Sequence, residues 1–176
     1  GAATASILSY LGLTEDDGIF NVLPMSFGYG LTQVLLMAMS GGTLHLEKSF
    51  AFPAFVLQRL AESRASVFPL VPSIASALVA MESLTPGFLP DVRILTSAAA
   101  AMPPAVAARL KQLFPGAQLH LMYGQTECIR ATTLPPKAFA SHPASVGFAI
   151  PDTQAFVLGE NSAPAPPGTV GELAVR

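Results

Sequence analysis

The chain has 176 residues, of which 51% are hydrophobic and only 11% are charged, so its composition excludes an intrinsically disordered segment and fits one folded domain. The formal net charge is −2 and the basic residues form no run, which argues against a nucleic acid or an anionic membrane surface as a partner. The single cysteine, Cys128, excludes an internal disulfide framework and favours a reducing, cytoplasmic location.

The first half of the sequence alternates between strand-like and helix-like runs. An apolar run that ends at Pro24 predicts a strand, and Gly41-Gly42 predicts the end of the helix that follows it. Proline is tolerated in the first turn of a helix because no N–H partner is needed there, so Pro53 and Pro72 predict two further helix starts. The predicted elements are strands over residues 19–23, 43–46 and 66–71 and helices over residues 29–40, 53–63 and 72–81.

The same alternation continues in the second half. A strand over residues 92–95 precedes a helix over residues 103–114, which Pro115-Gly116 ends, and a fifth strand covers residues 118–122. Such alternation is typical of βαβ crossovers, so we predict an α/β fold with a mostly parallel sheet and helices on both faces. In sheets of this kind, ligands bind outside the carboxyl ends of the strands.

The pattern changes after about residue 132. Residues 155–158 and 170–175 are strand candidates joined by a proline-rich turn, and no helix-length segment separates them. We therefore expect these two strands to pair antiparallel. The chain then divides into an α/β unit over residues 1–132, which carries the candidate site loops, and the start of a small β-rich segment over residues 133–176.

Residues 18–44 contain no acidic or basic side chain, which raises the question of a membrane-spanning helix. Pro24 and Gly28 interrupt this stretch, and its longest smooth helical part, residues 31–39, is far shorter than the ~20 apolar residues that a span needs. We predict buried core and no membrane span. The low overall charge leaves two explanations open: a surface covered by the rest of a larger protein, or a compositional bias towards proline and alanine.

Polar residues follow the fifth predicted strand in the sequence Met-Tyr-Gly-Gln-Thr-Glu-Cys, residues 122–128. The ring of Tyr123 can stack on a base, and Gly124 lets the backbone approach a ligand closely. The hydroxyl of Thr126 can reach a phosphate oxygen, and the carboxylate of Glu127 suits a hard cation such as Mg²⁺. The alternative that these residue types leave open is a polar turn with a solvated Glu127.

The segment Tyr123-Gly-Gln-Thr-Glu127 resembles the Y-G-x-T-E motif of the adenylate-forming superfamily, which includes acyl-CoA synthetases, adenylation domains of peptide synthetases and luciferases. The resemblance implies that Tyr123 lies against adenine and that Gly124 and Gln125 also belong to the nucleotide site. It further implies that Thr126 contacts the phosphate and that Glu127 binds Mg²⁺, which makes these two residues the candidate catalytic pair.

Further segments resemble family motifs in the family's order. Residues 94–104 resemble the adenine-side loop S-G-[AG]-[AE]-[PA]-L-P, which implies nucleotide contacts by Ala98, Ala99 and Ala100. Ala98 stands where the family usually has glycine, and its methyl group is expected to narrow the adenine side or shift the loop. Residues 146–151 and 166–173 resemble the segments V-G-x-P-x-P and P-x-G-x-x-G-E-L.

The early segment over residues 23–30 resembles the acyl-pocket motif P-x-x-[HF]-x-x-G, which implies that Phe27, Gly28 and Tyr29 bind the substrate acid. In family members that activate α-amino acids, an aromatic residue followed by aspartate usually occupies this motif, and the aspartate pairs with the substrate ammonium. Here the pair is Phe27-Gly28, so we predict an acid without an α-ammonium group, such as a fatty or aryl acid. A shift of the alignment by one residue, or a distant carboxylate, is the alternative.

The resemblance also implies parts that this sequence lacks: the phosphate loop ending in Pro-Lys-Gly, the T-G-D segment, the hinge and the C-terminal lid domain with its catalytic lysine. We therefore expect an internal piece of a larger, AMP-forming ligase, inactive alone. The whole enzyme is expected to use ATP and Mg²⁺ to activate a carboxylic acid and to transfer it to coenzyme A or to the phosphopantetheine of a carrier protein.

Other functions stay open at this point. A doubly wound nucleotide-binding module without catalysis, a non-catalytic adenylation-like domain and an amino-acid adenylation domain would share much of the pattern. His45, His120 and His142 have no ligand partner at metal-site spacing, so they are expected on the surface or hydrogen-bonded in the core. Ser97 lacks the G-x-S-x-G surroundings of a hydrolase nucleophile.

Overall fold

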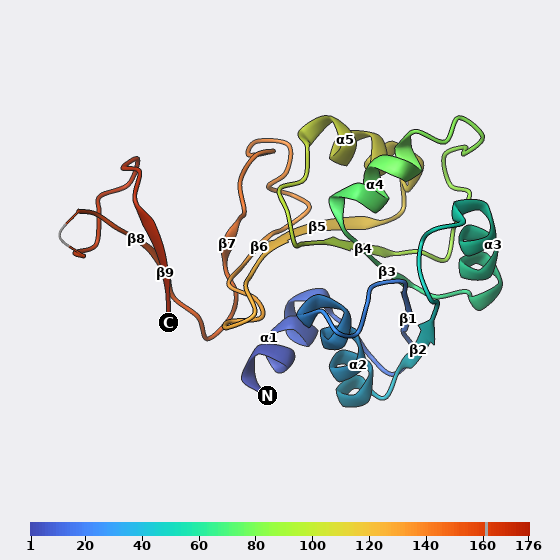
Figure 1. The fold of residues 1–176 in the computed structure, drawn as a ribbon, viewed down its shortest axis with the longest axis horizontal. Helices are drawn as coiled ribbons and strands as arrows, with labels where there is room; N and C mark the ends of the chain where they lie inside the picture. Colours follow the sequence, from blue (N-terminus) through green and yellow to red (C-terminus); the bar gives the residue numbers. More distant parts are fainter. Residues whose placement is uncertain (161) are drawn as a thin grey trace.

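The computed structural model describes residues 1–160 and 162–176 as an α/β sheet structure with a separate pair of short strands near the C-terminus (Figure 1). Helices and strands alternate through the first two thirds of the chain, and strands alone follow. In chain order the elements are α1 (Ala2–Leu11), β1 (Gly18–Asn21), α2 (Gly28–Ser40), β2 (Thr43–Leu46), α3 (Pro53–Ser63), β3 (Val67–Leu70), α4 (Pro72–Val79), β4 (Ile94–Ser97), α5 (Pro104–Leu113), β5 (Gln118–Tyr123), β6 (Thr132–Leu134), β7 (Phe148–Ala149), β8 (Ala155–Leu158) and β9 (Glu172–Val175).

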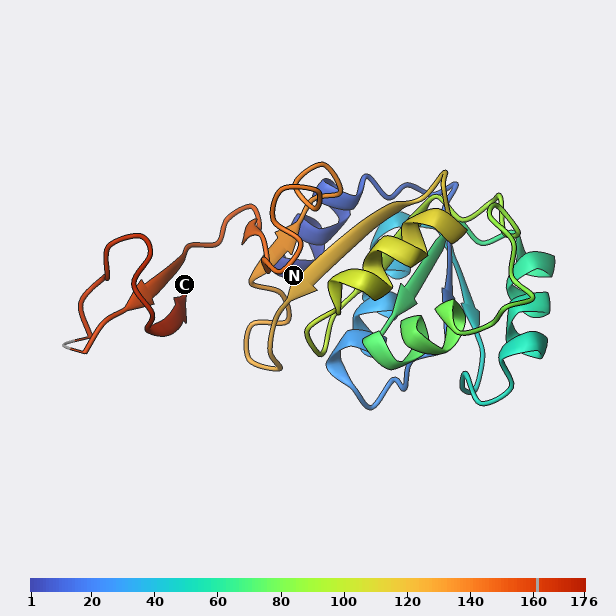
Figure 2. The ribbon, with the colours of Figure 1, turned by 90° about the horizontal axis from the view of Figure 1, so that it is seen from above.

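The main sheet has the strand order β2-β1-β3-β4-β5-β6-β7. Strands β1 to β5 pair in parallel, while β6 and β7 extend the sheet antiparallel beyond β5. Strands β8 and β9 form a second, antiparallel sheet that projects from one end of the molecule (Figure 2). The mostly parallel α/β fold and the antiparallel pairing of the last two strands are therefore confirmed.

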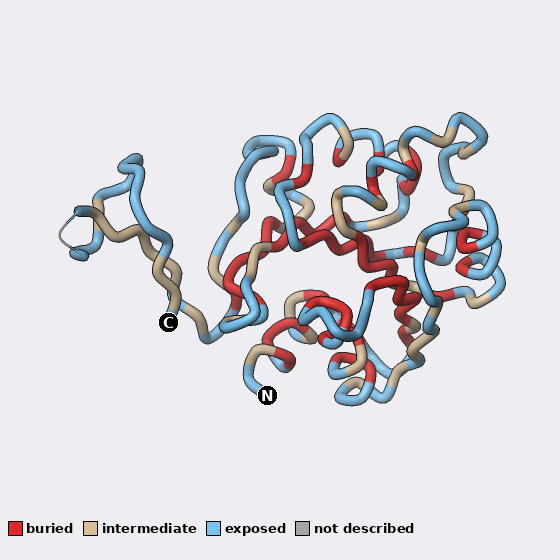
Figure 3. Tube along the Cα trace, in the orientation of Figure 1, coloured by how far each residue is buried: buried red, intermediate tan, exposed pale blue. Residues whose placement is uncertain are grey.

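Helices cover both faces of the main sheet, as predicted, and the strand residues alternate between the two faces. Ile19 and Val67 pack with α1 and α2, whereas their neighbours Phe20 and Phe68 pack with α3, α4 and α5. The strands in the middle are buried on both sides (Figure 3), which explains why β3 is a continuous apolar run and not an alternating one.

Three elements were not anticipated from the sequence: α1, β6 and β7. Helix α1 begins without a side-chain cap and consists mainly of small residues; its buried apolar residues are Ile7 and Leu11. Strands β6 and β7 are only three and two residues long, too short to show a period. The main sheet continues through β7, and the division of the chain at about residue 132 stays a prediction. No helix in the described parts of the chain is long and apolar enough to cross a membrane.

An ion pair ties together the amino ends of β1, β3 and β4. Asp17 is buried and accepts hydrogen bonds from Arg93 Nε at 2.9 Å and from Ser66 Oγ at 2.6 Å. Burial alone would raise the pKa of Asp17, but the hydrogen bonds from Arg93, Ser66 and the backbone of Thr14 outweigh it and hold the pKa below its usual value. This network fixes the end of the sheet opposite to the one where ligands bind in such folds.

Candidate active site

A cavity of about 280 Å³ lies at the carboxyl edge of the parallel strands. Three segments that are distant in sequence line it. The first is the start of α2, the second is the loop after β4, and the third is the turn after β5, and each holds residues that the sequence marked as candidates. The cavity-lining candidates are Phe27, Gly28, Tyr29, Ala98, Ala99, Gly124, Gln125 and Thr126.

Tyr29 forms a buried wall of this cavity. Its hydroxyl lies 2.7 Å from Thr96 Oγ1, which joins the first turn of α2 to β4. Burial raises the pKa of the Tyr29 phenol, although the nearby charge of Arg130 opposes the shift. Tyr29 is therefore a neutral hydrogen-bonding group at neutral pH. Phe27, in contrast, is 44% exposed at the mouth of the cavity.

Gly124 is required by the fold of its own turn. A Cβ atom at this position would lie 2.3 Å from the carbonyl oxygen of Ile129, closer than real Cβ contacts allow. The sequence expectation that this glycine admits a ligand to the backbone is therefore not the main reason for its presence, because the close neighbour is the chain's own backbone. The tight turn returns the chain to the sheet, where the backbone N–H of Ala131 donates to the carbonyl of Tyr123.

The loop after β4 holds one residue in the left-handed region. Ala99 has φ of 80°, and this conformation costs an alanine about 1–2 kcal/mol relative to ordinary backbone. Ala98, which stands at the family's usual glycine position, has no such strain and is buried. The departure from the family pattern at Ala98 therefore places a methyl group in the wall of the cavity, while the unusual backbone lies one residue later.

Tyr123 and Glu127 do not line the cavity of about 280 Å³. They line a neighbouring hollow of about 200 Å³, together with Gln125, Cys128 and residues of β9. Gln125 belongs to both cavities, and its Nε2 atom donates a hydrogen bond of 2.8 Å to the Tyr123 hydroxyl. Glu127 is exposed in the turn, so its carboxylate is accessible to a cation.

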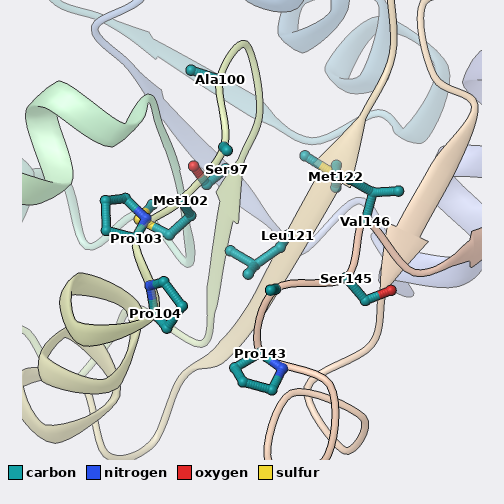
Figure 4. A pocket seen from close by; sticks show the side chains of 12 residues that line it. Ser97, Ala100, Met102, Pro103, Pro104, Leu121, Met122, Pro143, Ser145 and Val146 are labelled. Carbon is teal, nitrogen blue, oxygen red and sulfur yellow. The ribbon is translucent and has the colours of Figure 1, made fainter. Parts of the chain in front are cut away.

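Ala100 lies on the other side of its loop. It lines a third cavity, also of about 280 Å³, whose walls come from the end of β4, from β5 and from the segment before β7 (Figure 4). Ser97 lies there too, and its Oγ atom has no hydrogen-bond partner. The predicted nucleotide residues 98–100 are thus divided between two cavities.

Two buried polar residues near the site were missed by the sequence reading as functional candidates. Arg130 follows Ile129 and lines the cavity that also holds Phe27 and Tyr29. It is 3% exposed, and its guanidinium lies 5.2 Å from the centre of the Tyr29 ring. His120 on β5 is also buried, and neither of its ring nitrogens has a hydrogen-bond partner. The expectation of a surface or satisfied core histidine is therefore wrong for His120. The only sequence signal for Arg130 was a cation three residues after the Y-G-x-T-E motif.

The buried His120 predicts a specific pH dependence of stability. Desolvation lowers its pKa from 6.5 to about 4, so the unfolded chain binds this proton at a higher pH than the folded chain does. The free energy of unfolding is therefore expected to fall by about 3 kcal/mol as the pH falls from 6.5 to 4, and to gain nothing from this group above 6.5. Urea unfolding across this range measures the slope. His120→Phe should flatten it, whereas exposed His142→Gln should leave it unchanged; equal slopes for wild type and His120→Phe would contradict the assignment.

The described residues contain no group of three or more His, Cys, Asp or Glu side chains that could hold a metal ion. Mg²⁺, however, often takes only one or two carboxylates and completes its shell with water and substrate phosphates. The exposed Glu127, one residue after the Thr126 hydroxyl, fits that role and needs no second protein ligand.

Comparisons with known proteins agree with this arrangement. The family model for AMP-binding enzymes matches residues 1–176. The D-alanine–D-alanyl carrier protein ligase of Bacillus velezensis is 28% identical over 92% of this chain and 33% of its own length. A 4-coumarate–CoA ligase-like protein of Oryza sativa subsp. japonica is 31% identical over 88% of this chain and 29% of its own length. The chain thus spans about a third of the length of these curated relatives.

Solved structures give the same result. VinN is 36% identical with a TM-score of 0.85, and the match covers 98% of this chain and 43% of VinN. O-succinylbenzoate CoA synthetase from Bacillus subtilis, in complex with its acyl-adenylate intermediate, has a TM-score of 0.89 at 20% identity, which shows the shared fold; 99% of this chain and 35% of that one are covered. With its whole length matched by the family model, this chain belongs to the AMP-binding enzyme family, whose members are adenylate-forming ligases.

Proposed function

We propose that the enzyme carrying this chain activates a carboxylic acid with ATP to an acyl-adenylate and then transfers the acyl group to the thiol of coenzyme A or of a carrier-protein phosphopantetheine. The observation that carries the proposal is the single cavity lined by Phe27, Gly28 and Tyr29 on one side and by the turn after β5 on the other. An acid held by Phe27, Gly28 and Tyr29 would lie next to the turn after β5, whose residues are suited to binding a nucleotide. The chain alone is proposed to be inactive, because it spans only a third of its relatives' length.

In the proposed reaction, a carboxylate oxygen of the acid attacks the α-phosphorus of ATP. A new oxygen–phosphorus bond forms, the bond to the bridging oxygen breaks, and pyrophosphate leaves with the electron pair. Catalysis of such a transfer consists of positioning and charge stabilisation. Thr126 hydrogen-bonds a phosphate oxygen, Tyr123 and the loop over residues 98–100 hold the adenine, and Gln125 keeps the Tyr123 hydroxyl in place. Glu127 would hold Mg²⁺, which would supply positive charge next to the phosphates.

The charges around the cavity support an acid without an α-ammonium group. No aspartate or glutamate lines the cavity, and the one charged residue in its wall is the cation Arg130. A buried ammonium needs a counter-charge, and a neighbouring cation disfavours it further. This agrees with the absence of aspartate after Phe27.

Amino-acid activation is the second candidate function, and the names of the relatives favour it. VinN was solved with L-aspartate and with 3-methylaspartate, and the name of the carrier protein ligase from Bacillus velezensis includes D-alanine. For this chain to act in the same way, a carboxylate from outside the cavity wall would have to reach the substrate ammonium.

Acid-dependent exchange of pyrophosphate into ATP tests the proposal and separates the two candidates. The enzyme carrying this chain is assayed with matched pairs of an α-amino acid and its des-amino analogue. We expect exchange that depends on the acid, with kcat/KM at least tenfold higher for the des-amino acid, which corresponds to about 1.4 kcal/mol. A tenfold preference for the amino acid would overturn the substrate assignment, and no acid-dependent exchange with either series would overturn the proposed reaction.

A further inference from the structure

Arg130 is a buried cation that has no counter-charge. It is 3% exposed, its Nε atom has no hydrogen-bond partner, and none of the ion pairs between described residues includes it. Its contact with the Tyr29 ring is a cation–π interaction, which is weaker than the cost of removing a guanidinium from water, so the ring does not offset the burial.

Other buried polar atoms, on β5 and β6, also lack a hydrogen-bond partner. Besides Arg130 Nε, the buried side-chain atoms without a partner include Thr133 Oγ1, on the neighbouring strand β6, and both ring nitrogens of His120 on β5. Buried polar groups in native proteins are nearly always paired, and each exception needs an explanation. An anion that enters the cavity and reaches Arg130 would supply the missing charge.

The position of Arg130 distinguishes between two anions. Thr126 and Gln125 are exposed and form the open side of the cavity, whereas Tyr29, Ala98 and Arg130 are buried and form its inner wall. The nucleotide phosphates are assigned to the open side by Thr126. The Arg130 guanidinium lies 5.2 Å from the centre of the ring of Tyr29, a residue assigned to the acyl group, so the anion next to Arg130 is assigned to the acid.

We propose that Arg130 binds a second carboxylate on the acyl substrate, so that the enzyme activates a dicarboxylic acid at one end while Arg130 holds the other. This inference rests on the proposed function and adds to it the class of acid. The guanidinium is suited to the task because its planar donors match a carboxylate with two parallel hydrogen bonds.

Pairs of acids with equal chain length test the proposal, namely glutarate with valerate and succinate with butyrate, in pyrophosphate exchange by the enzyme carrying this chain. We expect the wild-type enzyme to prefer the diacid of one pair by about 100-fold in kcat/KM, and Arg130→Gln to remove that preference, mainly by lowering kcat/KM for the diacid. Arg130→Lys should retain part of the preference because it keeps the charge. The matched control is Arg109→Gln, at an exposed position on α5, which should leave kcat/KM unchanged for both acids of the pair.

Each other outcome has a defined meaning. Wild-type preference for the monocarboxylic acids overturns the diacid proposal and leaves the proposed reaction intact. Equal losses for both acids in Arg130→Gln, with a lowered unfolding midpoint, assign Arg130 to stability; a raised KM for ATP with both acids assigns it to a phosphate. If none of these acids supports pyrophosphate exchange by the wild-type enzyme, the proposed reaction fails. Calorimetric measurement of glutarate and valerate binding then tests the carboxylate site by itself.

Discussion

Replacement of Glu127 by glutamine is expected to lower the rate of acyl-adenylate formation about 100-fold or more in the enzyme that carries this chain. The substitution preserves the shape of the side chain and removes the full negative charge that is proposed to hold Mg²⁺. Because Glu127 is exposed and is part of no ion pair between the described residues, folding should be little affected. Pyrophosphate exchange at saturating acid measures the rate. In a titration with Mg²⁺, the variant should need a higher Mg²⁺ concentration for half-maximal exchange.

The control for this experiment is Glu82→Gln, which makes the same chemical change at an exposed position after α4, outside the cavities that hold the candidate residues. It should exchange pyrophosphate at the wild-type rate. Turnover near the wild-type level in Glu127→Gln would mean that the cation is held elsewhere and that the turn after β5 has a solvated, purely structural glutamate.

Arg93→Met is expected to destabilise the chain by about 3–5 kcal/mol, because it leaves the buried carboxylate of Asp17 without its cation. Urea unfolding of the chain at pH 7 measures this loss. Asp17→Asn should cost less, since Arg93 is 44% exposed and returns to water when its partner is neutral. The double variant should therefore be more stable than Arg93→Met alone.

Arg59→Met serves as the comparison, because Arg59 also pairs with a carboxylate, but at 3.7 Å and with Glu47, which is 19% exposed against 5% for Asp17. Exposed ion pairs contribute only about 0–1 kcal/mol, so this variant should remain close to wild type. A loss of less than about 1 kcal/mol in Arg93→Met would show that Asp17 finds another partner or water when the guanidinium is removed.

Much of the parallel sheet could be predicted from the sequence because its strands and helices are marked by local signals. Proline at the first turn of α3, α4 and α5 and glycine after α2 mark helix ends without reference to the rest of the fold. Helix α1 has no side-chain cap and few large apolar residues, and it is stabilised by tertiary packing of Ile7 and Leu11 against the sheet. Such an element leaves little local trace in the sequence.

The candidate site could be predicted only in part, because a motif gives the order of residues along the chain and not the direction of their side chains. The turn after β5 directs Gly124 and Thr126 to one cavity and Tyr123 and Glu127 to the neighbouring hollow. Arg130 was not a candidate, and His120 was wrongly expected to be exposed or hydrogen-bonded, for a related reason. Their burial is produced by long-range packing, so nothing next to them in sequence distinguishes them from exposed polar residues.

The tight turn at Gly124 also separates two kinds of evolutionary constraint within one motif. Any side chain at this position collides with the backbone of Ile129, so a descendant that had lost all activity would still retain the glycine in order to fold. Glu127 makes no such structural contribution, and the same descendant would be free to replace it. Within this motif, inheritance of the glycine therefore reports ancestry of the fold, whereas inheritance of the glutamate reports continued selection for the chemistry.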